Sequence, residues 1–96
     1  MTPLFSVETT AAFMRWFSTL ARKHAELRGL LADAKAVLAA DPYNRTRAHN
    51  IKKLTAIPRG EGQYRLRIGR WRFRYDIYAQ VVLLVDCSLR REDTYR

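Results

Sequence analysis

The chain has 96 residues, a formal net charge of +9 and one cysteine, and 48% of its residues are hydrophobic. This length predicts one domain over residues 1–96 with a modest core, and the apolar fraction argues against disorder. No apolar run approaches the roughly 20 residues that cross a bilayer, and we expect no secretory signal. Cys87 cannot form an internal disulfide, so we expect it to be a buried hydrophobe in a cytoplasmic protein.

The positive charge is concentrated in one part of the chain. Residues 1–42 carry five basic and four acidic residues, which leaves thirteen basic and five acidic residues, or about +8, for residues 43–96. Most of those bases are arginine, which binds phosphate through paired hydrogen bonds and stays charged when desolvated. A merely solubilising charge would be scattered, so this distribution predicts nucleic acid or an acidic protein as partner.

The first part of the chain predicts a strand followed by helix. We expect a short edge strand over residues 3–7, and Thr9 or Thr10 can cap the helix that follows. Apolar residues then recur at three- and four-residue steps over residues 11–40. A single helix of about 30 residues would be long against the usual 11–12. We therefore prefer a helical hairpin, broken within residues 21–25, to one long helix.

The second part predicts a loop and three strands. Asp41-Pro42 ends the helical pattern, because the residue before proline avoids the helical region. Residues 43–62 are polar and basic and predict a connecting loop. Strands over residues 64–68 and 71–78 should follow, and then an apolar central strand over residues 81–85, with tight turns between them. The fold class is therefore α+β, with an N-terminal strand, a helical hairpin and a three-strand antiparallel meander in a small twisted sheet.

Apolar and basic residues alternate between Gln63 and Tyr78. Successive side chains of a strand point to opposite faces, so Arg65 and Arg67 share one face of the first strand of this hairpin. Arg72 and Arg74 share one face of the second. The opposite faces hold the apolar residues Tyr64, Leu66, Ile68, Trp71, Phe73, Tyr75 and Ile77. This pattern predicts an apolar face against the core and a guanidinium face toward an anion.

Five short motifs occur in order along the chain. They are Asp41-Pro42, Lys52-Lys53-Leu54, Tyr64-Arg65-Leu66-Arg67-Ile68-Gly69, Trp71-Arg72-Phe73-Arg74-Tyr75 and Arg91-Glu92-Asp93-Thr94-Tyr95-Arg96. Together with the expected order of elements, they resemble the RelE/ParE superfamily of bacterial type II toxin–antitoxin toxins, from about Phe5 to Arg96. The resemblance implies a single RelE-like toxin domain with the RelE-like microbial RNase fold.

The resemblance also implies an activity and partners. RelE-type toxins cleave mRNA on the ribosome, whereas ParE-type toxins poison DNA gyrase. An acidic antitoxin protein covers the basic face of the toxin. Three hypotheses follow for this chain: a ribosome-dependent mRNA endonuclease, a gyrase inhibitor without nuclease activity, and a scaffold that only binds an antitoxin. We expect no cofactor, no metal and no membrane partner.

The resemblance assigns candidate residues by position. The catalytic set falls on Arg65, Arg67, Arg72, Arg91 and Tyr95. In the transesterification that such sites perform, Arg67 and Arg72 would bind the phosphate and Arg65 would position the backbone. Arg91 would lie near the leaving oxygen, and Tyr95 would orient or deprotonate the 2′-OH. Further RNA contacts are expected from Lys52, Lys53, Arg70, Arg74 and Arg90.

The identity of the general base stays open. RelE-type sites often have lysine where this chain has Arg65 and Arg67, and an arginine hardly releases its proton. The remaining candidates for the base are Tyr95, Glu92, Asp93 and His49.

Overall fold

The computed structural model describes residues 4–89, and within them it has two helices and five strands. In chain order they are β1 (Ser6–Thr9), α1 (Ala11–Lys23), α2 (Leu27–Ala40), β2 (Ile51–Lys53), β3 (Tyr64–Ile68), β4 (Trp71–Tyr78) and β5 (Val81–Leu89). The α+β class, the helical hairpin and the antiparallel meander are confirmed. Within residues 4–89, neither helix could span a lipid bilayer.

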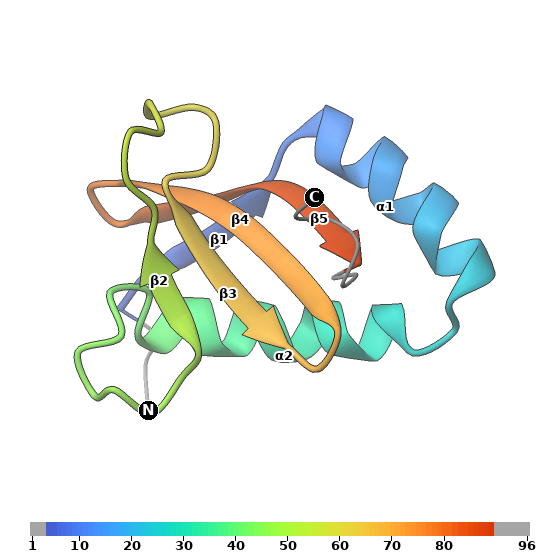
Figure 1. Cartoon of the computed structure of the whole chain (residues 1–96), viewed down its shortest axis with the longest axis horizontal. Helices are drawn as coiled ribbons and strands as arrows, with labels where there is room; N and C mark the ends of the chain where they lie inside the picture. The colour runs from blue at the N-terminus through green and yellow to red at the C-terminus, as the bar shows by residue number, and fades with distance from the viewer. Residues whose placement is uncertain (1–3, 90–96) are drawn as a thin grey trace.

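The strands form one five-stranded sheet in the order β1-β5-β4-β3-β2 (Figure 1). β1 runs parallel to β5, and every other neighbouring pair is antiparallel. β5 therefore lies between β1 and β4, so the apolar strand is an interior strand as the sequence predicts. It is also longer than expected, because it continues to Leu89.

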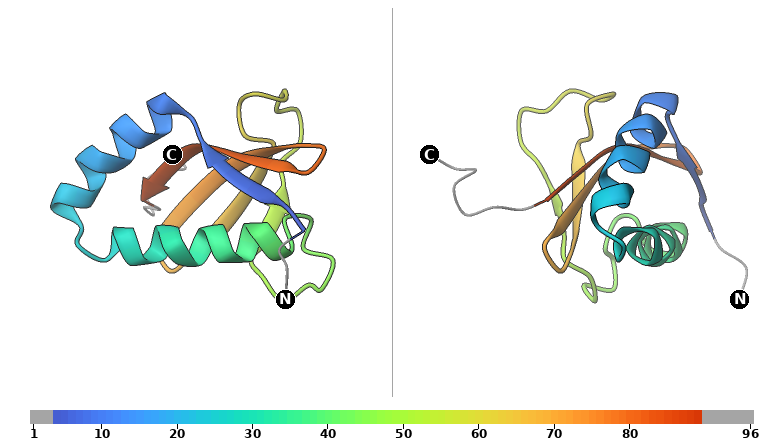
Figure 2. Two further views of the ribbon diagram at one scale, coloured as in Figure 1. Left: turned by 180° about the vertical axis from the view of Figure 1, so that it is seen from behind. Right: turned by 90° about the vertical axis from the view of Figure 1, so that its right-hand side faces the viewer.

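Both helices pack on the same side of the sheet (Figure 2), and their buried residues join the sheet in one core. The core residues from the helices are Phe13, Phe17, Ala21, Leu27, Leu31, Ala34 and Leu38. The sheet contributes Leu66, Trp71, Phe73, Tyr75, Ile77, Val82, Leu84 and Cys87. Neither helix covers the opposite side of the sheet, which we call the outer face.

The helical hairpin is broken at residues 24–26. Thr10 caps the start of α1 by accepting a hydrogen bond from the Phe13 amide at 2.9 Å, as one of the two expected caps. At the other end His24 leaves the helical region with φ −133° and ψ 93°, and its ring lies edge-on against Trp71 with centroids 4.9 Å apart. This packing against the sheet turns the chain into α2 although the apolar spacing continues through the break.

The alternation in β3 and β4 places side chains as the sequence predicts. Leu66, Trp71 and Phe73 are buried against the helices, and the arginines between them point to the outer face. The two strands are joined by Gly69 and Arg70, and Gly69 has φ +59°, a conformation that glycine adopts at little cost. Burial also leaves Cys87 inaccessible and raises the pKa of its thiol to about 12, which confirms a buried hydrophobe.

Two strand predictions need correction. The first strand covers Ser6–Thr9 rather than residues 3–7, because Ser6–Thr9 is the segment that pairs with β5; Pro3 lies outside the described residues. The expected loop over residues 43–62 contains the additional strand β2, which pairs with β3. A three-residue strand with two exposed lysines has no apolar alternation that could reveal it.

Replacing Tyr75 by Phe should lower the free energy of unfolding by about 1–2 kcal/mol, because it leaves a buried carbonyl without its donor. The Tyr75 hydroxyl donates to the Pro42 carbonyl at 2.7 Å and ties β4 to the loop after α2. Chemical denaturation measures the change. Tyr78→Phe, on the exposed end of the same strand, is the matched control and should change stability by less than about 0.5 kcal/mol. Equal effects of the two variants would contradict the role of this bond.

Candidate functional site

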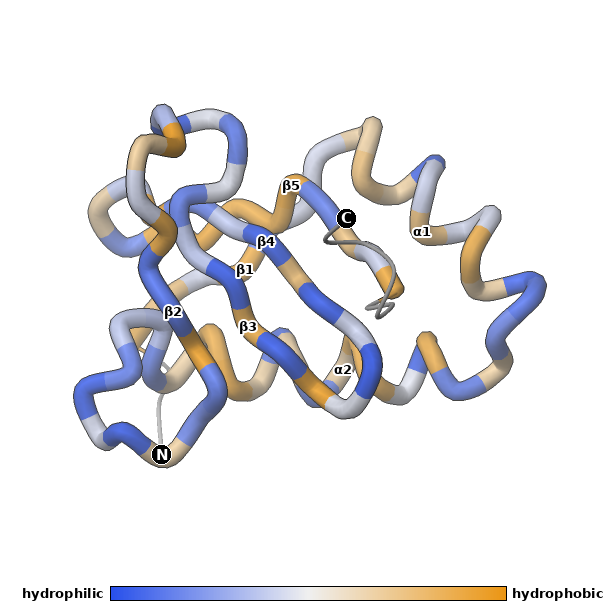
Figure 3. The backbone as a smooth tube through the Cα atoms, in the orientation of Figure 1, coloured by the Kyte–Doolittle hydropathy of each residue, from blue (hydrophilic) through white to orange (hydrophobic). Residues whose placement is uncertain are grey.

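Four arginines form two directly opposed pairs on the outer face. In the β3–β4 register Arg65 lies opposite Arg74, and Arg67 lies opposite Arg72. Opposed residues on one sheet face have Cβ atoms about 5 Å apart, and residues two apart along a strand are about 7 Å apart. Figure 3 shows the alternating hydrophilic and hydrophobic residues along both strands. We call Arg65, Arg67, Arg72 and Arg74 the arginine quartet.

The sheet holds the four guanidinium groups of the quartet close together although their positive charges repel one another. Like charges directly opposite one another destabilise a strand pair, yet all four arginines are half-buried at adjacent positions. The apolar residues that alternate with them fix their direction, because a one-residue slip would turn Leu66 and Phe73 out of the core. The sequence therefore concentrates positive charge at a place where the backbone cannot spread it apart.

Arg74 is fixed by a backbone carbonyl. Its Nε and Nη2 atoms donate to the Gly62 carbonyl at 3.1 and 2.9 Å. Gly62 can come this close because it has no side chain: an added Cβ would lie 2.8 Å from the Cβ of Arg74. Gly62 has φ +84°, which also favours glycine. Arg65 is oriented from the other side, where its Nη2 donates to the side chain of Asn50 at 3.4 Å.

A buried aspartate holds the loop that carries Gly62. Asp76 is fully buried, and its carboxylate accepts hydrogen bonds from the amides of Gly60, Gly62 and Gln63 at 3.0, 3.0 and 2.9 Å. By strand alternation Asp76 is on the same side of β4 as Arg74, so the loop after β2 covers it on the outer face. The sequence carries no signal for this role of Asp76, because its partners are backbone amides, which nearly every residue has.

The other expected RNA contacts divide between this face and other places. Lys52 lies opposite Arg65 in the β2–β3 register and is exposed, so it adds one positively charged side chain next to the quartet. Lys53 lies opposite Tyr64, with its ammonium 5.7 Å from the centre of that ring. Arg70 sits at the β3–β4 turn and pairs with Glu26 at 3.4 Å, away from the quartet. Arg90 lies outside the described residues, as do Arg91, Glu92, Asp93 and Tyr95.

A bulge in β5 brings two further polar residues to this face. Arg74 pairs with Asp86 but Tyr75 pairs with Leu84, so Val85 is an extra residue in β5. Leu84 and Cys87 can both point inward as a result, and Asp86 and Ser88 are left on the outer face beside Arg74 and Arg72. Strict alternation from Leu84 would have turned Asp86 inward, so its place could not be inferred from the sequence.

His49, a candidate base, contacts Asp41 and Asn44 in the loop after α2. Its Nε2 lies 4.0 Å from Oδ2 of Asp41, and its amide donates to the side chain of Asn44 at 3.1 Å. Asp41 also accepts from the amides of Arg45 and Thr46 and from the Thr46 hydroxyl, at 2.8, 3.1 and 2.7 Å. Burial of Asp41 acts to raise its pKa, but the bonds from Thr46 and Arg45 outweigh it and the pKa lies below its ordinary value of 3.8. These contacts give His49 a part in ordering the loop after α2.

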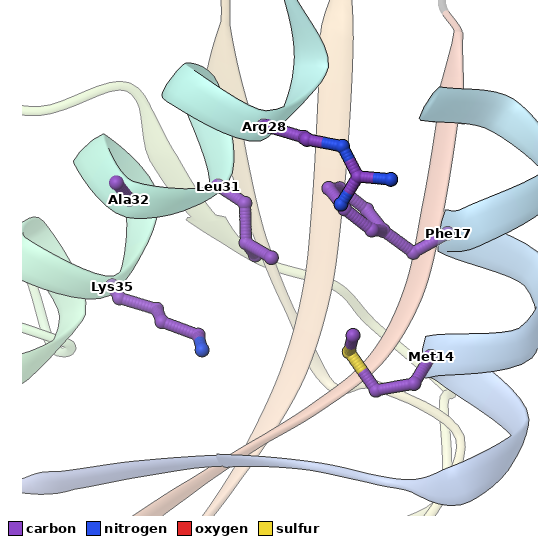
Figure 4. Close-up of a pocket in the computed structure, with 6 residues that line it drawn as sticks. All are labelled: Met14, Phe17, Arg28, Leu31, Ala32 and Lys35. Atoms are coloured by element: carbon purple, nitrogen blue, oxygen red, sulfur yellow. The ribbon is translucent and has the colours of Figure 1, made fainter. Parts of the chain in front are cut away.

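A hollow opens between the two helices on the other side of the molecule (Figure 4). It has a volume of about 280 Å³ and is lined by Met14, Phe17, Arg28, Leu31, Ala32 and Lys35. The side chains from α1 and α2 point toward one another across it. Its walls are mostly apolar, and its two charged residues are both basic.

Comparisons with known proteins bear on the fold. No protein-family model matches the sequence, and no curated protein matches it. The structure is similar to a chain in the crystal structure of the archaeal RelE–RelB complex from Pyrococcus horikoshii OT3, with a TM-score of 0.66 and 21% identity. The match covers 96% of this chain and 99% of that chain. The expected RelE-like fold is therefore confirmed over nearly the whole chain.

Acid should remove the contribution of Asp41 to stability. A carboxylate with a lowered pKa in the folded state stabilises the fold above its unfolded pKa, and this contribution disappears as the pH falls through the folded pKa. Asp41→Asn should therefore be less stable than the wild type at pH 7, and the difference should shrink as the pH falls from 5 to below 3. Urea denaturation across this range measures it, with the exposed Asp33→Asn on α2 as control. A difference that stays constant with pH would show that the charge of Asp41 does not matter.

Proposed function

We propose that this chain is the toxin of a type II toxin–antitoxin system and cleaves mRNA on the ribosome. The observation that carries the proposal is the arginine quartet, two opposed arginine pairs on the sheet face that neither helix covers. The quartet occurs in a fold that is similar to a chain of a RelE–RelB complex. This similarity supports RNA as the ligand of the outer face. Such a protein acts in the cytoplasm, with the ribosome, mRNA and an antitoxin as partners.

The quartet suits the charge that develops during RNA cleavage. When the ribose 2′-OH attacks the adjacent phosphorus, negative charge builds on the phosphorane oxygens and a cyclic phosphate forms as the 5′-oxygen leaves. Positive groups that are already in place stabilise this state most, because they need not reorganise. Arg67 and Arg72 are the opposed pair that would bind the scissile phosphate. Arg65 and Arg74 would bind the adjacent phosphate of the RNA chain.

We assign proton transfer to residues outside the quartet. His49 stays a candidate base, since its ring nitrogen lies 4.0 Å from the Asp41 carboxylate and a neighbouring carboxylate favours the protonated imidazole. Tyr95 would orient or deprotonate the 2′-OH, and Arg91 would lie near the leaving oxygen. Glu92 and Asp93 are the other candidates for the general base. Lys52 stands beside Arg65 and has the titratable amine that the arginines lack.

The antitoxin is proposed to be acidic and to use two surfaces. The outer face with its arginine quartet would attract carboxylates, and covering it would block RNA. The hollow between α1 and α2 has apolar walls with Arg28 and Lys35 among its lining residues, so it suits an amphipathic segment with acidic flanks. Charge complementarity of this kind would make association fast at low salt and weaker at high salt.

A second function is inhibition of DNA gyrase in the manner of ParE-type toxins. The observation that favours it is the identity of the quartet: all four groups are guanidinium groups, which bind anions well but are poor proton acceptors. Gyrase inhibition requires a binding surface and no general base.

The first test of the proposed nuclease is cleavage of mRNA on programmed ribosomes. The wild type should cleave, and Arg72→Ala or Arg67→Ala should each lower the rate by about 10³-fold, in line with single arginines in phosphoryl transfer. Arg22→Ala, an exposed arginine on α1, is the control and should cleave like the wild type. Absence of cleavage by the wild type, with gyrase cleavage complexes accumulating and mRNA intact in expressing cells, would favour the second function.

The second test is the salt dependence of RNA binding. For single-stranded RNA the slope of log K against log salt is about −0.7 for each phosphate neutralised. Arg67→Ala should reduce the steepness of this slope by about 0.7, whereas Arg67→Lys should keep it because the charge is kept. Fluorescence anisotropy with a labelled oligonucleotide between 50 and 300 mM salt measures both. A flat slope for the wild type would rule out binding through the quartet.

A further inference from the structure

We propose that Asp76 is a positioning residue that presets the guanidinium of Arg74 for an RNA phosphodiester by holding Gly62 in place. This inference rests on the proposed function for the identity of the ligand, but not for the arrangement of the residues. Asp76 would not touch the RNA. It acts through the loop, from its carboxylate to the Gly62 amide and from the Gly62 carbonyl to Arg74.

The first step is the attachment of the loop to Asp76. One carboxylate oxygen accepts from Gly60 and Gly62, and the other accepts from Gln63. Hydrogen bonds to an ionised acceptor are about twice as strong as those between neutral groups, so three of them fix the backbone firmly. A buried negative charge is costly unless its hydrogen bonds are satisfied, and here the three amides that satisfy it belong to residues 60–63, the segment that contains Gly62.

The second step is the orientation of Arg74 by Gly62. The Gly62 carbonyl accepts from Nε and from Nη2, so it holds one edge of the guanidinium plane. A guanidinium has five N–H donors, and the bonds to Gly62 use two of them, so three remain for a phosphate or for Asp86, which lies opposite Arg74 in the register. The close approach of Gly62 to Arg74 and to Val85 in the β5 bulge limits other positions of the loop.

The third step distinguishes two effects of Asp76 on anion binding, the effect of its negative charge and the effect of its hold on the loop. Asp76 is two residues from Arg74 on the same side of β4, so removing its negative charge would by itself strengthen anion binding to the quartet. If Asp76 acts by position, its loss should weaken binding instead. The two explanations therefore predict opposite signs for one substitution.

The experiment compares Asp76→Asn with Asp33→Asn, which changes the net charge equally on the exposed side of α2. Asparagine keeps the shape but replaces one acceptor oxygen by a donor, so one or two of the three amides lose their partner. Affinity for a labelled single-stranded RNA oligonucleotide at low salt should fall about tenfold in Asp76→Asn, as for loss of a hydrogen bond to a charged group. Asp33→Asn should stay within about twofold of the wild type.

A double-mutant cycle shows whether the effect passes through Arg74. Asp76→Asn should change affinity by less than about twofold when it is added to Arg74→Ala, since the group that it positions is gone. Unchanged or increased affinity in the single variant would overturn the proposal, and so would a full further loss in the double variant.

A measurement on the wild type covers the case in which Asp76→Asn does not fold. The NMR signal of the Arg74 Nε–H should exchange slowly with water in the absence of RNA, because the Gly62 carbonyl protects it. The exposed Arg22 is the reference, and equally fast exchange of the two would overturn the proposal. This readout needs no RNA: if the wild type failed to bind RNA, the proposed function would lose its substrate, while slow exchange would still support the step in which Gly62 holds Arg74.

Discussion

The register between β3 and β4 is the constraint on which the rest of this protein depends. It sets Arg65 opposite Arg74 and Arg67 opposite Arg72, at spacings where like charges repel. The same register buries Leu66, Trp71 and Phe73 against the two helices. The free energy of that burial, about 1.5–3 kcal/mol for each large apolar side chain, exceeds the repulsion of surface charges. The core therefore holds charges together that would separate on a less rigid support.

In the proposed site, contacts around the quartet orient two of its guanidinium groups in advance. Gly62 and Asn50 hold Arg74 and Arg65 from opposite sides, and Asp76 fixes the segment that contains Gly62. Arginines that are already oriented lose less side-chain entropy when they bind. The same preorganisation favours a transition state over a ground state, which links the stability of the loop to the proposed chemistry.

Sequence patterns predicted the parts of the fold that repeat regularly. Period-two alternation placed the quartet on one face, and the helical spacing indicated the hairpin, because both patterns report burial against a single core. Features that depend on one contact were not predictable. β2 has only three residues, the Val85 bulge reverses the facing of Asp86, and Asp76 is recognised by amides that every residue possesses. The candidate site was thus predicted in its charges but not in the loop that organises them.

The position of a bound phosphate tests the role of the arginine quartet most directly. A crystal structure with a short single-stranded RNA carrying a 2′-deoxy nucleotide at the scissile position, which cannot be cleaved, would locate it. We expect a backbone phosphate between Arg67 and Arg72, with the adjacent phosphate toward Arg65 and Arg74. A phosphate bound instead at the basic loop after α2 or between the helices, with the quartet unoccupied, would contradict this role.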